Sequence, residues 1–470
     1  MKNFIKFLKT DVKLINSYFL LAVIFIILIS IGYSSYALFS FTKTSNNVIE
    51  ATVGKIEKKP NAPVLASNMI PVYYDETAET WKKADLANPN NTYKWYDYNN
   101  GMWANAVTVT SSSRSKYLNA SIGTSISMND ITTMWVWIPR FNAVTPSNYN
   151  GGTQAKPNTI DVTFVKQNET AIDAFTFGDK ELSGFWYGKF ETSHTTLASS
   201  STTNNLGCTT ETCSNANGII IKPNVISLRW NDVSKFFFAS RSMEQTGNSF
   251  GFVTSEVDTH MSKNNEWGAV AYLTQSIYGR CTSSTTCTEV YINNSSEHYT
   301  GRSGGNVGGS TPINGTYTDQ TSTTQYNTYG FYTYDDYLLN YNTNTKGKKA
   351  KGKGTGASTT GTIYGIYDMS GGADEYVMGV YNKTIKLPGF SNLPDEKYYN
   401  NYTTTSYTGH ALTETKNWYS DGAYFVSSRY PWFMRGGFYI NSTRAGVFYF
   451  NYGGGNSNPD GSSRFVITNE

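Results

Sequence analysis

The stretch Tyr364-Gly-Ile-Tyr-Asp-Met-Ser-Gly-Gly-Ala-Asp-Glu-Tyr-Val377 is the most informative part of this chain for its fold. Its Gly371-Gly372 pair permits a turn with positive φ, because glycine has no Cβ that would clash there. Two other stretches, Met134-Trp-Val-Trp-Ile138 and Phe185-Trp-Tyr-Gly-Lys-Phe190, are short, apolar and rich in β-favouring residues. These two stretches predict strands.

Two further stretches predict helices. Val233–Met243 has an apolar face at helical spacing and follows Asn231-Asp232, which can cap its first turn. Lys263–Ser276 has a similar pattern. Segments 278–329 and 343–362 are rich in Gly, Ser, Thr and Asn, which predicts long loops, and long loops often carry function. We therefore expect an α+β domain of many short strands, two main helices and long loops.

Six blocks of the sequence resemble those of formylglycine-generating-enzyme-like domains, also called sulfatase-modifying-factor domains, and occur in the same order. Met434-Arg-Gly-Gly437, for example, resembles the family's L-R-G-G-S-W strand. The resemblance implies a C-type-lectin-like fold over residues 134–470. The six blocks are Met134–Pro139, Phe185–Thr192, Lys222–Asp232, Asn264–Tyr272, Tyr364–Val377 and Met434–Gly437.

Several residues in these blocks have expected structural roles. Trp267, on a helix beside Glu266, is expected to dock in the core. Arg435 is expected to place its guanidinium against a buried carboxylate, while Gly436 and Gly437 admit close backbone packing. The expected structural residues are Glu266, Trp267, Asp368, Glu375, Arg435, Gly436 and Gly437.

The chemistry of the family's enzyme branch is not expected here. That branch binds copper through two cysteines after the Arg-Gly-Gly block, and this chain has no cysteine after Cys287. An iron-dependent branch uses several histidines on an extra helical domain, whereas the 4 histidines here are scattered. We therefore expect no catalytic residue, no enzyme activity and no cofactor. The alternative is a structural calcium ion held by Glu375, with Asp374 as a substitute ligand.

A third branch of the family, the variable ligand-binding proteins of diversity-generating retroelements, resembles the C-terminal segment best. In that branch, framework residues alternate with side chains that form a solvent-facing binding surface. The alternative is that these side chains simply cover a β-rich end of the domain. Here Ser463-Arg464-Phe465 inverts the family's closing S-F-R. The residues expected to bind a ligand are Phe438, Ile440, Asn441, Ser442, Thr443, Arg444, Tyr449, Asn451, Tyr452, Asn456 and Asn458.

The N-terminal region predicts export. Lysines precede a stretch without charges at 14–42, whose apolar part can cross a hydrocarbon core of about 30 Å. We expect a cytoplasmic basic tail at 1–16, a transmembrane helix or signal anchor at 17–39, a linker at 40–68 and an N-terminal extension packed on the core at 69–133. The alternative is a signal peptide cleaved near Ser35-Tyr-Ala37. The body is therefore expected outside the cell, on a single-pass anchor or secreted.

The four cysteines form two close pairs, Cys208 with Cys213 and Cys281 with Cys287. Their spacings favour two local disulfides, which an oxidising compartment permits, over free thiols or a metal site.

Composition is consistent with a binding protein. The 38 basic and 35 acidic residues give a net charge of +3, which argues against a nucleic-acid partner. With 36 tyrosines and only 16% charged residues, the chain resembles binding loops. We expect a non-catalytic ligand-binding or display protein of a bacterial surface that binds a protein or glycan through its C-terminal loops. The alternatives are a metal-dependent enzyme of the formylglycine-generating type that acts on exported substrates and a structural surface or matrix component.

Overall fold

The computed structural model describes residues 39–43, 49–53, 59–89, 92–197, 206–208, 213–302, 354–386 and 389–469. The chain divides into two units, Met1–Lys59 and Pro60–Glu470. In the first unit, β1 (Phe39–Lys43) and β2 (Ile49–Val53) form an antiparallel hairpin. The predicted basic tail and most of the predicted membrane span lie outside the described residues.

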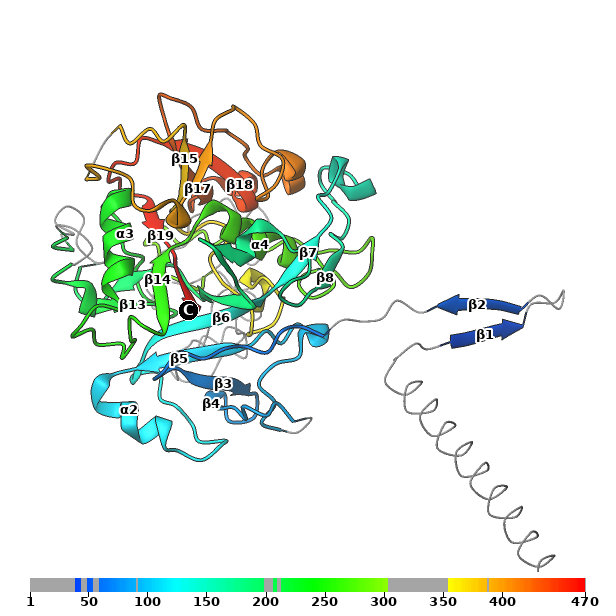
Figure 1. The fold of residues 1–470 in the computed structure, drawn as a ribbon, viewed down its shortest axis with the longest axis horizontal. Helices are drawn as coiled ribbons and strands as arrows, with labels where there is room; N and C mark the ends of the chain where they lie inside the picture. Colours follow the sequence, from blue (N-terminus) through cyan, green and yellow to red (C-terminus); the bar gives the residue numbers. More distant parts are fainter. Residues whose placement is uncertain are drawn as a thin grey trace, which may run out of the picture. The chain divides into compact units, whose positions relative to one another are not determined.

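The second unit is built around a seven-stranded sheet in which every neighbouring pair is antiparallel (Figure 1). The predicted strands at 134–138 and 185–190 are its central strands β6 and β11. Strands from 69–133 continue the same sheet beside β6. In spatial order, the sheet contains β14 (Val257–Met261), β20 (Phe465–Asn469), β11 (Gly184–Gly188), β6 (Ile131–Pro139), β5 (Asn105–Val109), β3 (Ile70–Asp75) and β4 (Thr80–Lys83).

A second, five-stranded sheet carries the C-terminal strands. β15 pairs in parallel with β16 and β19 and antiparallel with β17, which pairs in turn with β18. Its strands are β15 (Asp374–Tyr381), β16 (Asn400–Tyr402), β17 (Trp432–Gly436), β18 (Gly446–Gly453) and β19 (Gly461–Ser463). Three short strand pairs complete the described strands: β7 (Phe141–Ala143) with β8 (Val162–Phe164), β9 (Thr176–Phe177) with β10 (Lys180–Glu181), and β12 (Ser193–His194) with β13 (Ile219–Ile220).

Two of the described helices match the predictions. Helix α3 (Val233–Ser242) begins at Asp232, whose side chain accepts from the Lys235 backbone N–H at 3.0 Å. Every residue of α4 (Asn264–Thr274) is buried, which suits a helix with little polar face. The sequence did not predict α2 (Ser111–Leu118), because this serine-rich helix buries only Tyr117 and lacks an apolar stripe.

The expected architecture needs correction. The described chain is mostly β-sheet with three short helices, rather than an α+β domain with two main helices and a membrane helix in front. Its sheets are consistent with a lectin-like β fold. In the ranges that the structure describes, no helix has both the length and the apolar character needed to cross a membrane. Phe39, the last residue of the predicted span, begins strand β1.

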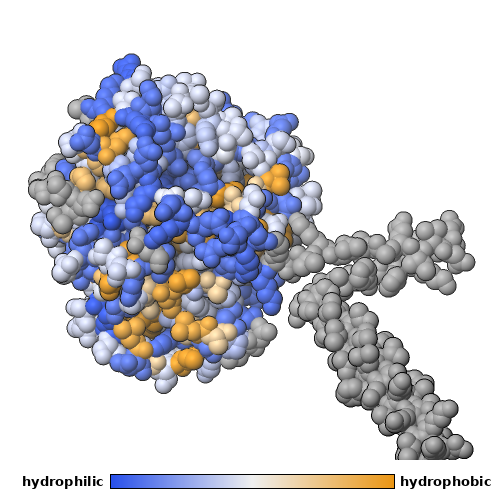
Figure 2. Space-filling model, viewed as in Figure 1, coloured by the Kyte–Doolittle hydropathy of each residue, from blue (hydrophilic) through white to orange (hydrophobic). Residues whose placement is uncertain are grey.

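The core of the second unit is unusually aromatic. Nine of the 10 tryptophans are fully buried, and Trp137 and Trp186 pack with ring centroids 5.2 Å apart across β6 and β11. The surface is largely hydrophilic on the face shown in Figure 2. The long polar loops are therefore anchored to a large, closely packed aromatic core. The nine are Trp81, Trp95, Trp103, Trp135, Trp137, Trp186, Trp267, Trp418 and Trp432.

Candidate functional site

The predicted ligand-binding residues lie on and around the second sheet. Residues 437–445 join β17 to β18, and residues 454–460 lead from β18 to β19. Figure 1 shows β15, β17 and β18 together at one end of the second unit, while β3 and β4 lie at the other end. The candidate site therefore consists of the second sheet and the loops at its edges.

The structure places the eleven predicted residues at very different depths. The prediction is wrong for Tyr449, which is only 3% exposed, because its ring packs against Gly422. A Cβ on Gly422 would lie 2.8 Å from that ring. Burial is the main reason why the pKa of the Tyr449 hydroxyl is raised. Of the rest, Ile440, Thr443, Arg444, Tyr452 and Asn456 are exposed, and Phe438, Asn441, Ser442, Asn451 and Asn458 are half-buried.

The exposed members do not form one continuous surface. Ile440, Thr443 and Arg444 lie in the loop before β18, whereas Tyr452 lies near the far end of that strand. At about 3.3 Å per residue, the length of β18 separates these two groups by roughly 20 Å. The structure therefore divides the predicted surface into two parts.

Two of the half-buried asparagines shape the backbone. The Asn441 side-chain oxygen accepts from the Phe438 N–H at 2.8 Å, and the Asn458 side-chain oxygen accepts from the Asp460 N–H at 2.9 Å. Side-chain amides used in this way stabilise turns. We therefore assign Asn441 and Asn458 to the framework of the loops.

The most distinctive exposed feature is a tyrosine cluster formed by Tyr424, Tyr430 and Tyr452. Tyr430 and Tyr452 stack with centroids 5.1 Å apart and an interplanar angle of 16°, and Tyr424 meets Tyr452 edge-on at 6.5 Å. All three side chains are between 37% and 43% exposed. The Arg429 guanidinium lies 5.3 Å from the Tyr430 ring centre. Exposed, mutually packed aromatic rings with a cation beside them are typical of a binding surface.

The backbone fixes the three tyrosines in place. The Tyr424 N–H donates to the Phe450 carbonyl of β18 at 2.9 Å. Ser427 and Tyr430 exchange backbone hydrogen bonds, each of 3.1 Å, in a tight turn. Tyr452 lies opposite Phe433 in the β17–β18 ladder. The cluster is therefore held before any ligand binds, which lowers the entropy cost of binding.

Sequence reasoning found only one member of this cluster. Tyr452 was predicted, but Tyr424 and Tyr430 were not among the residues expected to bind a ligand. The useful signal is the recurrence of tyrosine at 419, 424 and 430 in a loop that also carries several serines.

The expected partner of Arg435 is also corrected. Its guanidinium donates to the side-chain oxygen of Asn264 at 3.0 Å and to the carbonyls of Ala411 and His410 at 3.0 and 3.2 Å. None of these acceptors is a carboxylate. Burial lowers the pKa of Arg435 to about 10. Arg435 therefore joins β17 to α4 and to the 410–411 loop.

The other expected structural residues are buried. The Trp267 indole N–H donates to the Val447 carbonyl at 2.9 Å, and Glu266 contacts the His260 ring at 3.0 Å. Asp368 accepts from the Gly301 N–H at 2.8 Å. Gly436 and Gly437 have φ of 81° and 71°, and Gly371 and Gly372 have 77° and 76°, so these two turns require residues that tolerate the left-handed region.

The residues expected to bind calcium do not fit that role well. Both carboxylate oxygens of Glu375 accept from the Arg464 guanidinium, so they are not free to bind a cation. Asp374 is 6% exposed, and burial, followed by the charge of Asp460, raises its pKa well above the usual range. Within the described ranges, no three His, Cys, Asp or Glu side chains group closely enough to hold a metal ion. We therefore derive no function through a metal.

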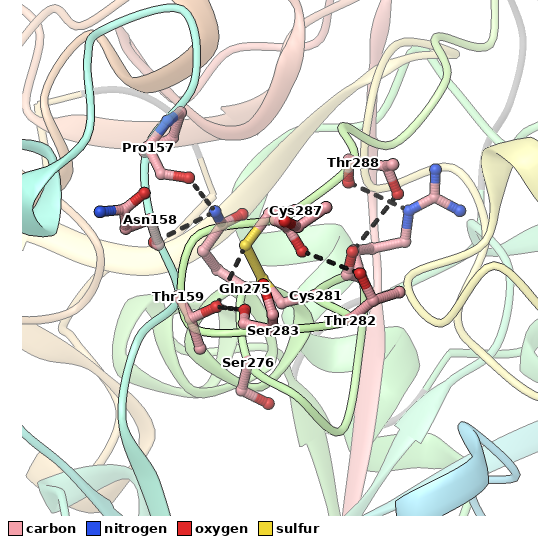
Figure 3. The surroundings of a disulfide bond; sticks show 12 residues. Pro157, Asn158, Thr159, Gln275, Ser276, Cys281, Thr282, Ser283, Cys287 and Thr288 are labelled. Carbon is pink, nitrogen blue, oxygen red and sulfur yellow. Dashed lines mark hydrogen bonds between the residues drawn. A yellow bond between two sulfur atoms is a disulfide. The ribbon is translucent and has the colours of Figure 1, made fainter.

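The four cysteines form the two local disulfides that their spacing favours. Cys208 pairs with Cys213 and Cys281 pairs with Cys287, so the chain has no free thiol. Figure 3 shows Thr159 beside the second bridge, with its hydroxyl 3.3 Å from the Cys287 sulfur. Two disulfides indicate an oxidising environment of the kind found outside the cytoplasm.

Comparisons with known proteins give little guidance. No family model matches the chain, and no curated protein matches it. A solved structure described as "Major Tropism Determinant U1 Variant" is similar at 14% identity over 75% of this chain and 68% of that chain, with a TM-score of 0.22. A TM-score this low gives no information on the function of this chain.

Proposed function

We propose that this protein is an exported, non-catalytic ligand-binding protein that contacts a protein or glycan at the cell exterior through the tyrosine cluster. The observation that carries the proposal is the stacking of Tyr430 on Tyr452 at the surface. Tyrosine gives a large contact area at low entropic cost, and its ring can pack on a sugar face or on an apolar side chain.

A non-catalytic role agrees with the state of the cysteines. All four are held in disulfides, whereas copper-dependent oxidation of a cysteine substrate needs thiolate ligands. We expect the full chain, loaded with copper and mixed with a sulfatase-type peptide, to produce no formylglycine. Turnover in that assay would contradict this part of the proposal.

The binding role is tested with glycan and protein arrays probed with the full chain. Changing Tyr424, Tyr430 and Tyr452 to serine together should abolish at least one set of array hits, because the exposed aromatic area of the cluster is lost. Tyr407→Ser is the matched control, since Tyr407 is 38% exposed but lies in another loop. A triple variant that keeps every wild-type hit would refute the proposed surface, and self-assembly without any hit would favour the structural-component alternative.

A further inference from the structure

A groove lies in the N-terminal part of the folded unit, apart from the tyrosine cluster. It has a volume of about 490 Å³ and is lined by residues 73–77 from β3 and its turn, by residues between 92 and 102, and by Tyr364. This volume falls within the range of roughly 300–1,000 Å³ that is usual for small-ligand sites. We call it the N-terminal groove. Its strand β3 lies at the opposite end of the unit from β18, the strand that carries Tyr452 (Figure 1).

The polar wall of the groove places a donor beside an acceptor. The Lys94 ammonium lies 3.0 Å from Asp97 Oδ2, and the Asn100 amide donates to the same oxygen at 2.8 Å. The Asp97 carboxylate also accepts from the Asn100 backbone N–H, and a carboxylate, with about four lone-pair sites, keeps further acceptor capacity. Lys94 makes one hydrogen bond there and has further N–H groups to donate. A ligand therefore meets a part-exposed carboxylate next to a part-exposed ammonium, each with capacity for a further hydrogen bond.

The backbone holds this wall rigid. The Asp97 N–H donates to the Met102 carbonyl at 2.7 Å, and the Met102 N–H donates back at 2.9 Å. Gly101 closes the turn with φ of 65°. Across the groove, the Tyr364 hydroxyl bonds both the N–H and the carbonyl of Tyr74, at 3.1 and 3.2 Å. The polar groups are thus positioned before a ligand arrives.

The charges in the groove select against anions. Three carboxylates, Asp75, Glu76 and Asp97, line it together with a single lysine, Lys94. A hydrogen bond from Lys82, followed by one from the Ala78 N–H, lowers the pKa of Asp75, so this carboxylate is charged at neutral pH. A phosphate, sulfate or carboxylate ligand would be repelled. The tyrosines and Met102 in the lining supply apolar contact for a ligand with a carbon skeleton.

We propose that the N-terminal groove binds a neutral saccharide through a pair of adjacent hydroxyl groups. One hydroxyl accepts from the Lys94 ammonium, and its neighbour donates to the Asp97 carboxylate. The spacing of vicinal hydroxyls suits this pairing, because Lys94 and Asp97 are themselves in direct contact. The groove extends the proposed function, since it is a binding site that does not depend on the tyrosine cluster.

The test is a glycan array probed with the full chain, followed by calorimetry with the neutral oligosaccharides that it identifies. Loss of a hydrogen bond to a charged group predicts about a tenfold to hundredfold weaker Kd for Lys94→Met and for Asp97→Ala. Lys94→Met should still fold, because the Lys94 side chain is part-exposed and its ion pair with Asp97 lies at the rim of the groove. Sialylated and uronate-containing glycans should bind at least tenfold more weakly than neutral ones.

The tyrosine-to-serine triple variant separates the two sites. It should leave neutral saccharide binding at the N-terminal groove unchanged, whatever its effect on other array hits. The inference is overturned if no neutral saccharide binds, if anionic glycans bind equally well, or if the folded Lys94→Met and Asp97→Ala variants keep the wild-type Kd.

Discussion

Arg464 holds Glu375 in a fully buried, two-point ion pair. Its Nε lies 3.0 Å from Oε2 and its Nη2 contacts Oε1, and both residues are 0% exposed. A third donor, Nη1, reaches the Gly188 carbonyl at 2.9 Å. Arg464 lies between β19 and β20, whereas Glu375 lies in β15 and Gly188 in β11. The Arg464 guanidinium therefore links the five-stranded sheet to the seven-stranded sheet. Burial raises the pKa of Glu375 to about 6, against the opposing effect of Arg464.

Removal of one partner of this pair should be severe. Arg464→Met leaves a buried carboxylate without its counter-ion, so we expect the free energy of unfolding to fall by about 3–5 kcal/mol in urea denaturation. Arg444→Met, the same change in an exposed loop, should cost less than about 0.5 kcal/mol. The double variant Arg464→Met/Glu375→Gln should recover part of the loss. A single variant as stable as the wild type would contradict this role.

This pair shows what the sequence could and could not predict. The sequence predicted that Arg435, the arginine of the Arg-Gly-Gly block, would meet a buried carboxylate, and this was wrong: the arginine that pairs with Glu375 is Arg464. Glu375 and Arg435 are opposite each other in the β15–β17 ladder. Arg435 nevertheless points its donors at α4 and the 410–411 loop. Tertiary packing, which a single sequence does not show, decides which of the two arginines meets the carboxylate.

The prediction of the helices and of the binding surface was limited in the same way, because local sequence signals do not show tertiary contacts. Helix α3 was predictable because its apolar spacing and its Asp232 cap are local signals, whereas the serine-rich α2 has neither. The tyrosine cluster depends on a loop that folds back beside β18, which places Tyr424 and Tyr430 next to Tyr452. Such long-range contacts leave no mark in a single sequence, so only Tyr452 could be chosen.

Gly446 should be irreplaceable for steric reasons. A Cβ at this position would lie 2.1 Å from both carboxylate oxygens of Asp421. Asp421 is 2% exposed and accepts from the Phe448 N–H at 3.0 Å, so it has little freedom to move. We expect Gly446→Ala to lower the free energy of unfolding by about 1–3 kcal/mol.

Gly454→Ala is the matched control for Gly446→Ala. The nearest atom to a Cβ on Gly454 is the Asn456 side-chain oxygen at 3.5 Å, which is ordinary contact. This variant should change stability by less than about 0.5 kcal/mol in the same denaturation experiment. Equal effects at the two glycines would show that Asp421 can move aside.

The Cys281–Cys287 disulfide should give a modest, local stabilisation. It closes a loop with a sequence separation of only 6, for which the loop-entropy model gives about 2 kcal/mol. The Ser284 carbonyl in this loop also accepts a hydrogen bond from the Thr159 N–H at 3.2 Å. We expect Cys281→Ser/Cys287→Ser to lower the urea midpoint and to increase proteolysis within 282–286. Addition of a reductant to the Cys208→Ser/Cys213→Ser variant should reproduce the shift, and no shift in either case would contradict the estimate.

Glu289 should make the protein less stable as the pH rises. Burial raises its pKa from 4.5 to about 8, although Arg280 acts in the opposite direction, and its charge in turn raises the pKa of Asp421. A carboxyl group whose folded pKa is raised contributes stability that is fully present below about pH 4.5. This contribution is lost as the pH rises through about 8, because the unfolded chain releases the proton first. Glu289→Gln cannot ionise, so its stability should fall less steeply over this window, by up to about 1.4 kcal/mol per pH unit.

The measurement is urea unfolding of the wild type and Glu289→Gln at several pH values from 5 to 8, with the two curves subtracted so that groups common to both cancel. Glu396→Gln is the control, because its hydrogen bond with Lys383 lowers the pKa of Glu396 and moves its titration below this window. The free energy of unfolding of Glu289→Gln minus that of the wild type should increase as the pH rises. A difference that stays constant from pH 5 to 8 would show that Glu289 is already ionised in the folded state, and its burial would then have to be offset by Arg280.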